Sequence, residues 1–262
     1  MTARSLASSR EKARARILAG EVVVDGVPAA KPGLMIDENA EITLLGEGER
    51  FVGRGGEKLE KLLAEKKPVL TGLRCLDVGA STGGFTDAML KRGAEIVYAV
   101  DVGTGQLAEE LRSDRRVVNL EKTDIRTVTP EMLGGAVDFA GIDVSFISLS
   151  KILPQVALLV RPGGELGCLI KPQFEAGRER VGKHGVVRDP DVHVSVLCAV
   201  LAAAAAAGFA ARELTYSPIR GGSGNIEYLL YAVRTEEGVL AEMPDAGLAE
   251  RTVHEAFLYH RQ

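Results

Sequence analysis

The 262-residue sequence has no tryptophan, few other aromatic residues and only three cysteines. Because aromatic residues make up 5% of the chain and no RNP-type motif is present, we expect no RRM-like stacking platform. Cys75, Cys168 and Cys198 lie far apart inside apolar runs and form no CxxC pair, so they suggest no metal site. We interpret all three as small buried core residues in a reducing cytoplasm.

The sequence also lacks an apolar signal-peptide core near its N-terminus. Residues Val194 to Ala211 have the length of a membrane span, but they are mostly alanine and include Ser195 and Gly208. We interpret them as a buried amphipathic helix that ends at Gly208, with a membrane span as the alternative. The net charge of −4 excludes a polycation, so any nucleic-acid binding must come from local basic patches.

The N-terminal residues predict a small basic module. Ala13, Ile17 and Leu18 have helical spacing, which leaves the basic residues a shared face; Ser8 or Ser9 would cap this helix and Gly20 would end it. The basic residues are Arg4, Arg10, Lys12, Arg14 and Arg16.

Extended segments follow this helix. Glu21 to Val24 precedes the turn signal Asp25-Gly26, and Ala40 to Leu45 reads as a further strand. We therefore expect an α+β module over residues 1–45 and a polar, glycine-containing linker over residues 46–57.

From Leu73 onward, short apolar segments alternate with helical ones, which predicts a second domain over residues 58–262 with a mostly parallel, doubly wound sheet. The Asp189-Pro190 pair should start the alanine-rich helix. The expected strands are Cys75–Val78, Ile96–Val100, Val117–Leu120, Phe139–Asp143, Glu165–Ile170, Phe209–Tyr216 and Ile226–Val233. The expected helices include Glu57–Glu65, Thr86–Arg92, Gln106–Leu111 and Leu149–Val160.

A glycine-rich turn follows the first of these strands. Glycine lets the backbone approach a ligand closely, and the helix start that follows offers free N–H groups. Asp101 ends the next strand, twenty-two residues after Gly79, where an acid can accept both hydroxyls of a ribose. The candidate cofactor residues are Asp77, Gly79, Ala80, Ser81, Thr82, Gly83, Gly84, Phe85, Asp101, Val102, Asp124, Ile125 and Asp143.

The loop spacing bears on which cofactor binds. It lacks the GxGxxG pattern of pyrophosphate sites, and Asp77 stands two residues before the first glycine. This arrangement resembles motif I of methyltransferases that use S-adenosyl-L-methionine, with NAD(P) as the alternative. Asp124 could face an adenine or be a solvated loop acid.

Four charged residues stand at positions typical of a ligand crevice. Asp143 and Lys171 end apolar strands, Lys58 follows a glycine pair, and Glu227 precedes the last strand. Methylating a ribose 2′-OH requires a base, and a lysine can serve if its pKa is lowered towards neutrality. Lys58 and Lys171 could lower each other's pKa by repulsion, while Asp143 and Glu227 hold them. The alternative for each residue is an ordinary solvated charge.

The order Lys58, Asp143, Lys171, Glu227 resembles the K-D-K-E tetrad of the FtsJ/RrmJ class of ribose 2′-O-methyltransferases. Residues 5–10 (SLASSR) with 23–26 (VVDG) are similar to an S4 domain. With residues 54–59 (RGGEKL), 77–86 (DVGASTGGFT) and 170–175 (IKPQFE), nearly the whole chain resembles the TlyA family. In that family an S4 domain precedes a Rossmann-like methyltransferase domain with a seven-stranded sheet.

This resemblance implies a bacterial enzyme of a family whose members are called hemolysin A or 16S/23S rRNA (cytidine-2′-O)-methyltransferase. It implies S-adenosyl-L-methionine as cofactor, no metal, ribosomal RNA or ribosomal subunits as partner, a cytoplasmic location and no stable membrane association. Lys171 would be the base, by analogy with the class. A helix with an Arg-Leu-Asp start is missing, so we expect the S4 module to be N-terminally incomplete.

Basic residues predict where RNA binds. They are Arg4, Arg10, Lys12, Arg14, Arg16, Arg54, Arg178, Arg180, Lys183 and Arg188. The alternative for residues 178–188 is a solvated, mobile loop. Two further hypotheses are an inactive RNA-binding or ribosome-assembly protein and a hemolysin-like membrane-active protein.

Overall fold

The computed structural model describes residues 1–4, 6–7, 10–18, 20–29, 31–44, 51–66, 68–236, 238–242, 244–245 and 247–261. Of Ala3, Glu11, Lys12 and Ala15 only the backbone is described. The predicted helix caps Ser8 and Ser9 and the predicted RNA contact of the Lys12 side chain therefore lie outside this description. The chain forms two compact units, residues 1–50 and 51–262.

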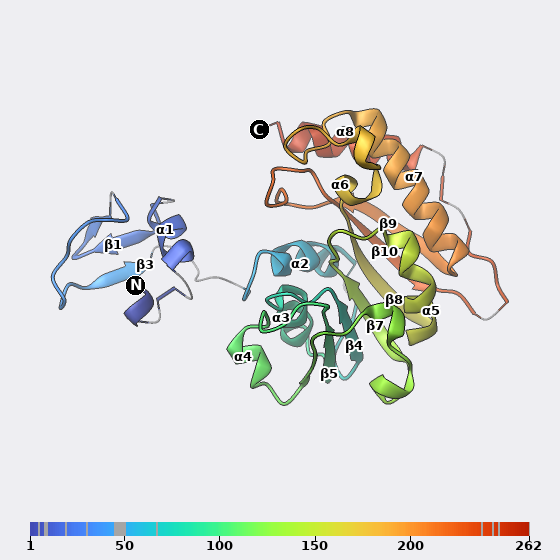
Figure 1. Ribbon diagram of the computed structural model, residues 1–262, viewed down its shortest axis with the longest axis horizontal. Helices are drawn as coiled ribbons and strands as arrows, with labels where there is room; N and C mark the ends of the chain where they lie inside the picture. The colour runs from blue at the N-terminus through green and yellow to red at the C-terminus, as the bar shows by residue number, and fades with distance from the viewer. Residues whose placement is uncertain are drawn as a thin grey trace. The chain divides into compact units, whose positions relative to one another are not determined.

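The first unit joins one helix to a small antiparallel sheet (Figure 1). Asp25 and Gly26 both have positive φ, as a tight hairpin turn requires, and this confirms the predicted turn. The strand before the turn lies between the two others, with Val23 opposite Pro28 on one side and Thr43 on the other. The elements are η1 (Thr2–Arg4), α1 (Arg10–Leu18), β1 (Val22–Val24), β2 (Val27–Pro28) and β3 (Ile42–Leu44).

The second unit contains a seven-stranded sheet in the order β6-β5-β4-β7-β8-β10-β9, and this confirms the predicted fold class (Figure 1). All strand pairs from β6 to β8 are parallel, whereas β10 runs antiparallel to both β8 and β9. The strands are β4 (Arg74–Val78), β5 (Ile96–Val100), β6 (Val117–Leu120), β7 (Val137–Ile142), β8 (Val160–Ile170), β9 (Phe209–Tyr216) and β10 (Tyr228–Arg234).

Helices cover both faces of this sheet, with α2 and α3 on one side and α5 and α7 on the other (Figure 1). Along β4, Cys75 packs with the α2 and α3 side and Leu76 with the α5 and α7 side, as strand alternation requires. The helices are α2 (Gly55–Lys66), α3 (Gly84–Lys91), α4 (Glu109–Arg112), α5 (Leu153–Leu159), α6 (Pro172–Glu175), α7 (Pro190–Ala206) and α8 (Leu248–Tyr259). The short 3₁₀ turns are η2 (Ile125–Thr127), η3 (Glu131–Leu133), η4 (Leu149–Lys151) and η5 (Arg178–Arg180).

The alanine-rich helix α7 starts as predicted, because the Asp189 side chain accepts a hydrogen bond from the Asp191 backbone and Pro190 occupies the first turn. One face is buried, and Gly208 follows the helix end with positive φ. Among the described residues, no helix is both long and apolar enough to cross a membrane.

Several local expectations are wrong. Cys198 is exposed on α7 rather than buried. The helix expected from Leu149 to Val160 splits into η4 and the shorter α5, because Pro154 starts a new helix and Val160 already pairs with Val137. The helix expected from Gln106 is reduced to α4, and α8 was not predicted.

The predicted linker over residues 46–57 also differs from the structure. Residues 51–57 belong to the second compact unit, and residues 45–50 lie outside the described part of the chain. Phe51 is buried against Gly56, and the helix α2 already begins at Gly55. Because Phe51 packs against the start of α2, residues 51–57 form part of the second unit and not of a flexible linker.

Candidate active site

The candidate site lies where the order of the strands reverses, between β4 and β7. From β4 the chain moves outward to β5 and β6, and then returns to the other side of β4 as β7. The loops after β4 and β7 therefore diverge and leave a crevice at the carboxyl ends of the strands. A Cβ atom at Gly79 would lie 2.7 Å from the carbonyl oxygen of Asp143, and Gly79 also has positive φ. Glycine is thus required where these two loops meet.

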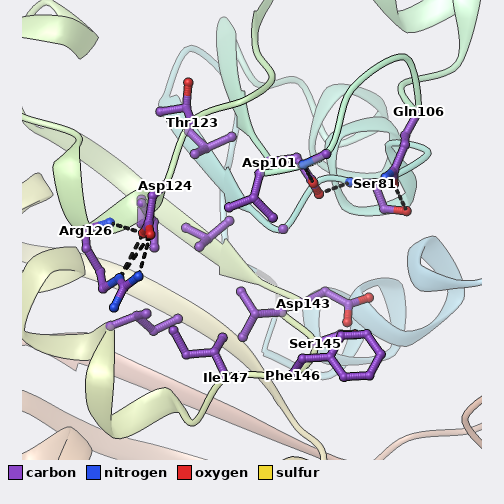
Figure 2. A pocket seen from close by; sticks show the side chains of 18 residues that line it. Ser81, Asp101, Gln106, Thr123, Asp124, Arg126, Asp143, Ser145, Phe146 and Ile147 are labelled. Atoms are coloured by element: carbon purple, nitrogen blue, oxygen red, sulfur yellow. Dashed lines mark hydrogen bonds and ion pairs between the residues drawn. The ribbon is translucent and has the colours of Figure 1, made fainter.

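The glycine loop is held by Asp101 at the end of β5. Asp101 Oδ2 accepts a hydrogen bond from the Ser81 backbone N–H at 2.8 Å, and Oδ1 accepts one from Gly103 at 2.7 Å (Figure 2). Ser81 has positive φ, and its hydroxyl contacts the Gln106 side chain at 3.2 Å. Each carboxylate oxygen still has lone-pair capacity for a ligand hydroxyl.

A cavity of about 490 Å³ opens beside Asp101 (Figure 2). Predicted cofactor residues that line it are Gly79, Ser81, Asp101, Val102, Asp124, Ile125 and Asp143. The Asp124 carboxylate is paired with Arg126 at 2.6 Å, so in this structure it points to a neighbour within the cavity wall. Val78, Val100 and Ile152 complete an apolar part of the lining.

A second cavity, of about 190 Å³, shares Gly79, Ser81, Asp143 and Ser145 with the first. It brings together further predicted residues, namely Ala80, Thr82, Gly84, Phe85 and Lys171. The two cavities are therefore adjacent, with Asp143 and Ser145 at their junction.

Asp77 and Gly83 line neither cavity. A Cβ atom at Gly83 would overlap Leu111, so this glycine allows close packing. Asp77 is fully buried, and its Oδ2 accepts hydrogen bonds from the Thr86 backbone N–H and hydroxyl. Burial raises the pKa of Asp77 to about 7, with smaller contributions from Asp143 and Asp101, although the bonds from Thr86 oppose this rise.

Two of the four tetrad residues meet at the junction of the cavities. Lys171 Nζ, at the end of β8, lies 2.6 Å from Asp143 Oδ1, at the end of β7. The same Nζ donates a hydrogen bond to Ser145 Oγ at 3.0 Å. The Lys171 side chain is 11% exposed, so its ammonium faces the cavity without being open to bulk solvent. Sequence analysis did not single out Ser145, which carries no charge and stands in no recognised motif.

The other two tetrad residues form a buried pair. Lys58 Nζ on α2 lies 2.6 Å from Glu227 Oε2, and both side chains are less than a tenth exposed. Neither residue lines a described cavity. We predicted that Lys58 and Lys171 repel each other. In the structure each lysine nitrogen is instead paired with a carboxylate.

Glycines bring the start of α2 close to the active-site loops. The nitrogen of Gly56 would lie 2.8 Å from a Cβ atom at Gly84, and Asp143 Oδ2 would lie 3.2 Å from one at Gly55. The Lys58–Glu227 pair ties this helix to the segment that precedes β10.

Phe146, an exposed aromatic residue that was not predicted from the sequence, lies three positions after Asp143. Phe146 has positive φ and is 90% exposed, yet it lines the larger cavity (Figure 2). Its ring centroid lies 4.9 Å from that of Phe174 in the turn after Lys171. Such a conformation is costly for a bulky residue, which makes Phe146 a candidate for function. The only sequence signal was an aromatic residue three positions after Asp143.

The basic loop after α6 is anchored at its second half. The fully buried Asn225 accepts a hydrogen bond from the Val187 N–H at 3.0 Å and donates one to Gly185 O at 2.8 Å. His193 contacts both Val187 O at 3.0 Å and the Tyr228 hydroxyl at 2.8 Å. Burial lowers the pKa of His193. The backbone at Gly185 and Val187 is therefore anchored, and RNA binding by the basic side chains of the loop stays a prediction.

The basic side chains predicted to contact RNA differ in their exposure and in their hydrogen-bond partners within the protein. Arg178, Arg180, Lys183 and Arg188 are all exposed, and Arg180 also donates a hydrogen bond to Ala176 O at 2.6 Å. Arg54 donates to the carbonyl of Arg220. In the first unit, Arg10 and Arg14 are exposed, Arg4 donates to Ala40 O, and Arg16 is largely buried against Glu21 at 3.1 Å.

The residues of the larger cavity fit S-adenosyl-L-methionine. Asp101 offers carboxylate oxygens to a ribose diol, the apolar lining suits an adenine ring, and the glycine loop lets a ligand approach the start of α3. The two cations in the linings, Arg126 and Lys171, are each paired with a carboxylate, and Asp143 places a negative charge at the junction of the cavities, where a sulfonium would lie.

Comparison with known proteins agrees with this arrangement. The family model described as "FtsJ-like methyltransferase" matches residues 51–234, and that of the S4 domain matches residues 2–42. A solved structure of an S-adenosylmethionine-dependent methyltransferase from Listeria monocytogenes shares the fold, with a TM-score of 0.51 at 16% identity over 70% of this chain and 100% of that chain.

Closer relatives cover nearly the whole chain. The provisionally named rRNA methyltransferase YqxC of Bacillus subtilis is 48% identical over 97% of this chain and 90% of its own length. The 16S/23S rRNA (cytidine-2′-O)-methyltransferase TlyA of Mycobacterium tuberculosis is 45% identical over 89% and 87%. A solved structure provisionally named a hemolysin, from Streptococcus thermophilus, is 45% identical over 98% and 93%, with a TM-score of 0.80. The predicted family, enzyme class and S-adenosyl-L-methionine cofactor are thereby confirmed: the chain belongs to the TlyA family of FtsJ-like methyltransferases.

Proposed function

We propose that this protein transfers a methyl group from S-adenosyl-L-methionine to the ribose 2′-OH of a cytidine in bacterial ribosomal RNA. 23S RNA is the primary substrate, and 16S RNA is a second one to be tested. The observation that carries the proposal is Lys171, whose Nζ faces the junction of two adjacent cavities beside Asp143. The activity for which the Mycobacterium tuberculosis relative is named supports the same substrate class.

When bound, the cofactor supplies a methyl group on a sulfonium, whose carbon–sulfur bond breaks with its electron pair left on sulfur. Asp101, Val102 and Ile125 would hold its nucleoside end. The loop residues that line the smaller cavity would hold its amino-acid end, namely Gly79, Ala80, Ser81, Thr82 and Gly84. Asp124 would be the weakest contact of the set, because Arg126 already occupies its carboxylate.

Lys171 would act as the base. The reaction requires the neutral amine of Lys171, whose Nζ accepts the proton of the ribose hydroxyl as the oxygen bonds to the methyl carbon. The ammonium that forms then loses its proton to solvent, which restores the amine. Asp143 holds this nitrogen in place, and the Lys58–Glu227 pair would fix α2, whose start lies beside Asp143. Alignment of the hydroxyl with the methyl carbon supplies much of the rate.

Two surfaces of the second unit would bind the substrate. Arg178, Lys183 and Arg188 lie exposed on an anchored loop and suit phosphate contacts. Phe146 presents an aromatic face at the cavity, which suits stacking against an unstacked nucleobase. Residues 1–45 would act as an S4-type RNA-binding domain, with Arg10 and Arg14 on its surface. Because its substrate is ribosomal, we place the enzyme in the cytoplasm.

The test is transfer of tritium from labelled S-adenosyl-L-methionine to purified 50S and 30S subunits from a strain that lacks the enzyme. Label in RNA, with none in ribosomal protein after nuclease treatment, is the expected result. Cofactor binding by calorimetry is the parallel control. Binding of both cofactor and RNA without transfer would instead favour an inactive RNA-binding or assembly protein.

A further inference from the structure

Ser145 lies where the chemistry of the proposed reaction takes place. It lines both cavities, and its hydroxyl accepts a hydrogen bond from Lys171 Nζ at 3.0 Å. Asp143 Oδ1 lies 2.6 Å from the same nitrogen. Two oxygen atoms of one loop therefore lie beside the nitrogen of the base, Ser145 Oγ as a hydrogen-bond acceptor and Asp143 Oδ1 as an ion-pair partner.

This arrangement has a geometric consequence for an amine. A neutral lysine nitrogen has four tetrahedral directions, which are taken by Cε, two N–H bonds and one lone pair. If Asp143 and Ser145 each accept one N–H, the lone pair must occupy the remaining direction. With Asp143 alone, the nitrogen could rotate about the Cε–Nζ bond and turn its lone pair away from the substrate.

The geometry points to Ser145 as a positioning residue that, with Asp143, aims the lone pair of Lys171 at the ribose hydroxyl. This inference rests on the proposed function, because it assigns Ser145 a part in the same proton transfer. Ser145 acts through Lys171 and has no bond to the reacting atoms of its own.

The loop that carries Ser145 is fixed on both sides. The Asp143 N–H donates to Val78 O at 2.9 Å, which ties the start of the loop to β4. Glu175 accepts hydrogen bonds from the Ser148 hydroxyl at 2.7 Å and from the Leu149 N–H at 2.9 Å, which ties its end to α6. Because Lys171 directly precedes α6, the base and its acceptor Ser145 are attached to one another through Glu175 as well. A fixed hydroxyl can direct a side chain in a way that solvent cannot.

The test compares Ser145→Thr with Ser145→Val. Threonine and valine have the same shape, but only threonine retains a hydroxyl, so any effect of branching is common to both. Saturating methyl transfer to ribosomal subunits is measured together with cofactor affinity and the KM for RNA. We expect Ser145→Thr to stay near wild type and the kcat of Ser145→Val to fall about tenfold or more, with both binding constants unchanged.

The outcomes separate this inference from the proposed function. If wild type transfers no methyl group to RNA, the proposed function fails. If wild type is active and Ser145→Val matches Ser145→Thr, only the positioning role is overturned. A loss of cofactor affinity in Ser145→Val that accounts for its lost activity would also overturn it, because the hydroxyl would then serve the structure of the pocket.

Discussion

Gly221 faces the carboxylate of Glu227, and a Cβ atom at Gly221 would overlap Glu227 Oε1. Glu227 in turn forms the buried ion pair with Lys58. The absence of a side chain at Gly221 therefore gives the tetrad pair its space. A Cβ atom at Gly222, the next residue, would point into open space.

Gly221→Ala should displace Glu227 and strain the Lys58 pair, whereas Gly222→Ala should be silent. We expect Gly221→Ala to lower the free energy of unfolding by about 1–3 kcal/mol and to reduce methyl transfer. Urea denaturation and tritium transfer measure the two effects. Equal behaviour of the two alanine variants would show that Glu227 adjusts without cost.

Asp101→Ala should weaken cofactor binding, because Asp101 both holds the glycine loop and offers oxygens to the ribose. A loss of about tenfold or more in affinity is expected, since a hydrogen bond to a charged group contributes about 1.5–3 kcal/mol. Asp124→Ala is the matched control, because its carboxylate is already paired with Arg126. Calorimetry with S-adenosyl-L-methionine gives both values; a larger loss for Asp124→Ala would reverse the assignment.

Phe146→Ala should impair the use of RNA and leave cofactor affinity unchanged, because its exposed ring is placed to meet the substrate. Stacking of one base on an aromatic side chain contributes about 1–3 kcal/mol, so we expect kcat/KM for ribosomal subunits to fall about tenfold. Phe146→Tyr retains the ring and should retain activity. If both variants behave as wild type, the ring takes no part in substrate binding.

Asp77 makes stability depend on pH in an unusual direction. Its pKa is raised from 3.8 to about 7 by burial, so the folded state retains a proton that the unfolded chain releases. Unfolding should therefore become easier as pH rises through this window, by up to about 1.4 kcal/mol per pH unit. Asp77→Asn, which keeps an acceptor for Thr86, should remove this trend. Denaturation midpoints of both proteins, measured across the window, would contradict the assignment if their pH dependence were parallel.

Local sequence patterns predicted much of the fold and of the cofactor site. Alternating apolar segments indicated the strands, and acids at strand ends indicated Asp101 and Asp143, because both signals arise within a few consecutive residues. The break before α5 was missed because the apolar helical pattern continues on both sides of Pro154. The start of β8 was missed because only the pairing of Val160 with Val137 shows that a strand begins there.

Contacts between distant residues could not be predicted in this way. Ser145 matters because β7 and β8 are neighbours, which brings it to Lys171, 26 positions away. The pairing of Lys58 with Glu227 likewise depends on where α2 meets the start of β10, not on spacing along the chain. Phe146 combines an exposed ring with a left-handed backbone, a conformation that is rare for a bulky residue and that no local pattern signals.

The central claim is that Lys171 removes the proton from a ribose 2′-OH of ribosomal RNA. The most direct measurement is mass-spectrometric mapping of 2′-O-methylcytidine in subunits treated with wild type or Lys171→Met, after cofactor binding has been shown for both. We predict a single modified ribose with wild type and none with Lys171→Met. Unmodified RNA with wild type, a methyl group on a base, or full modification by Lys171→Met would contradict the account.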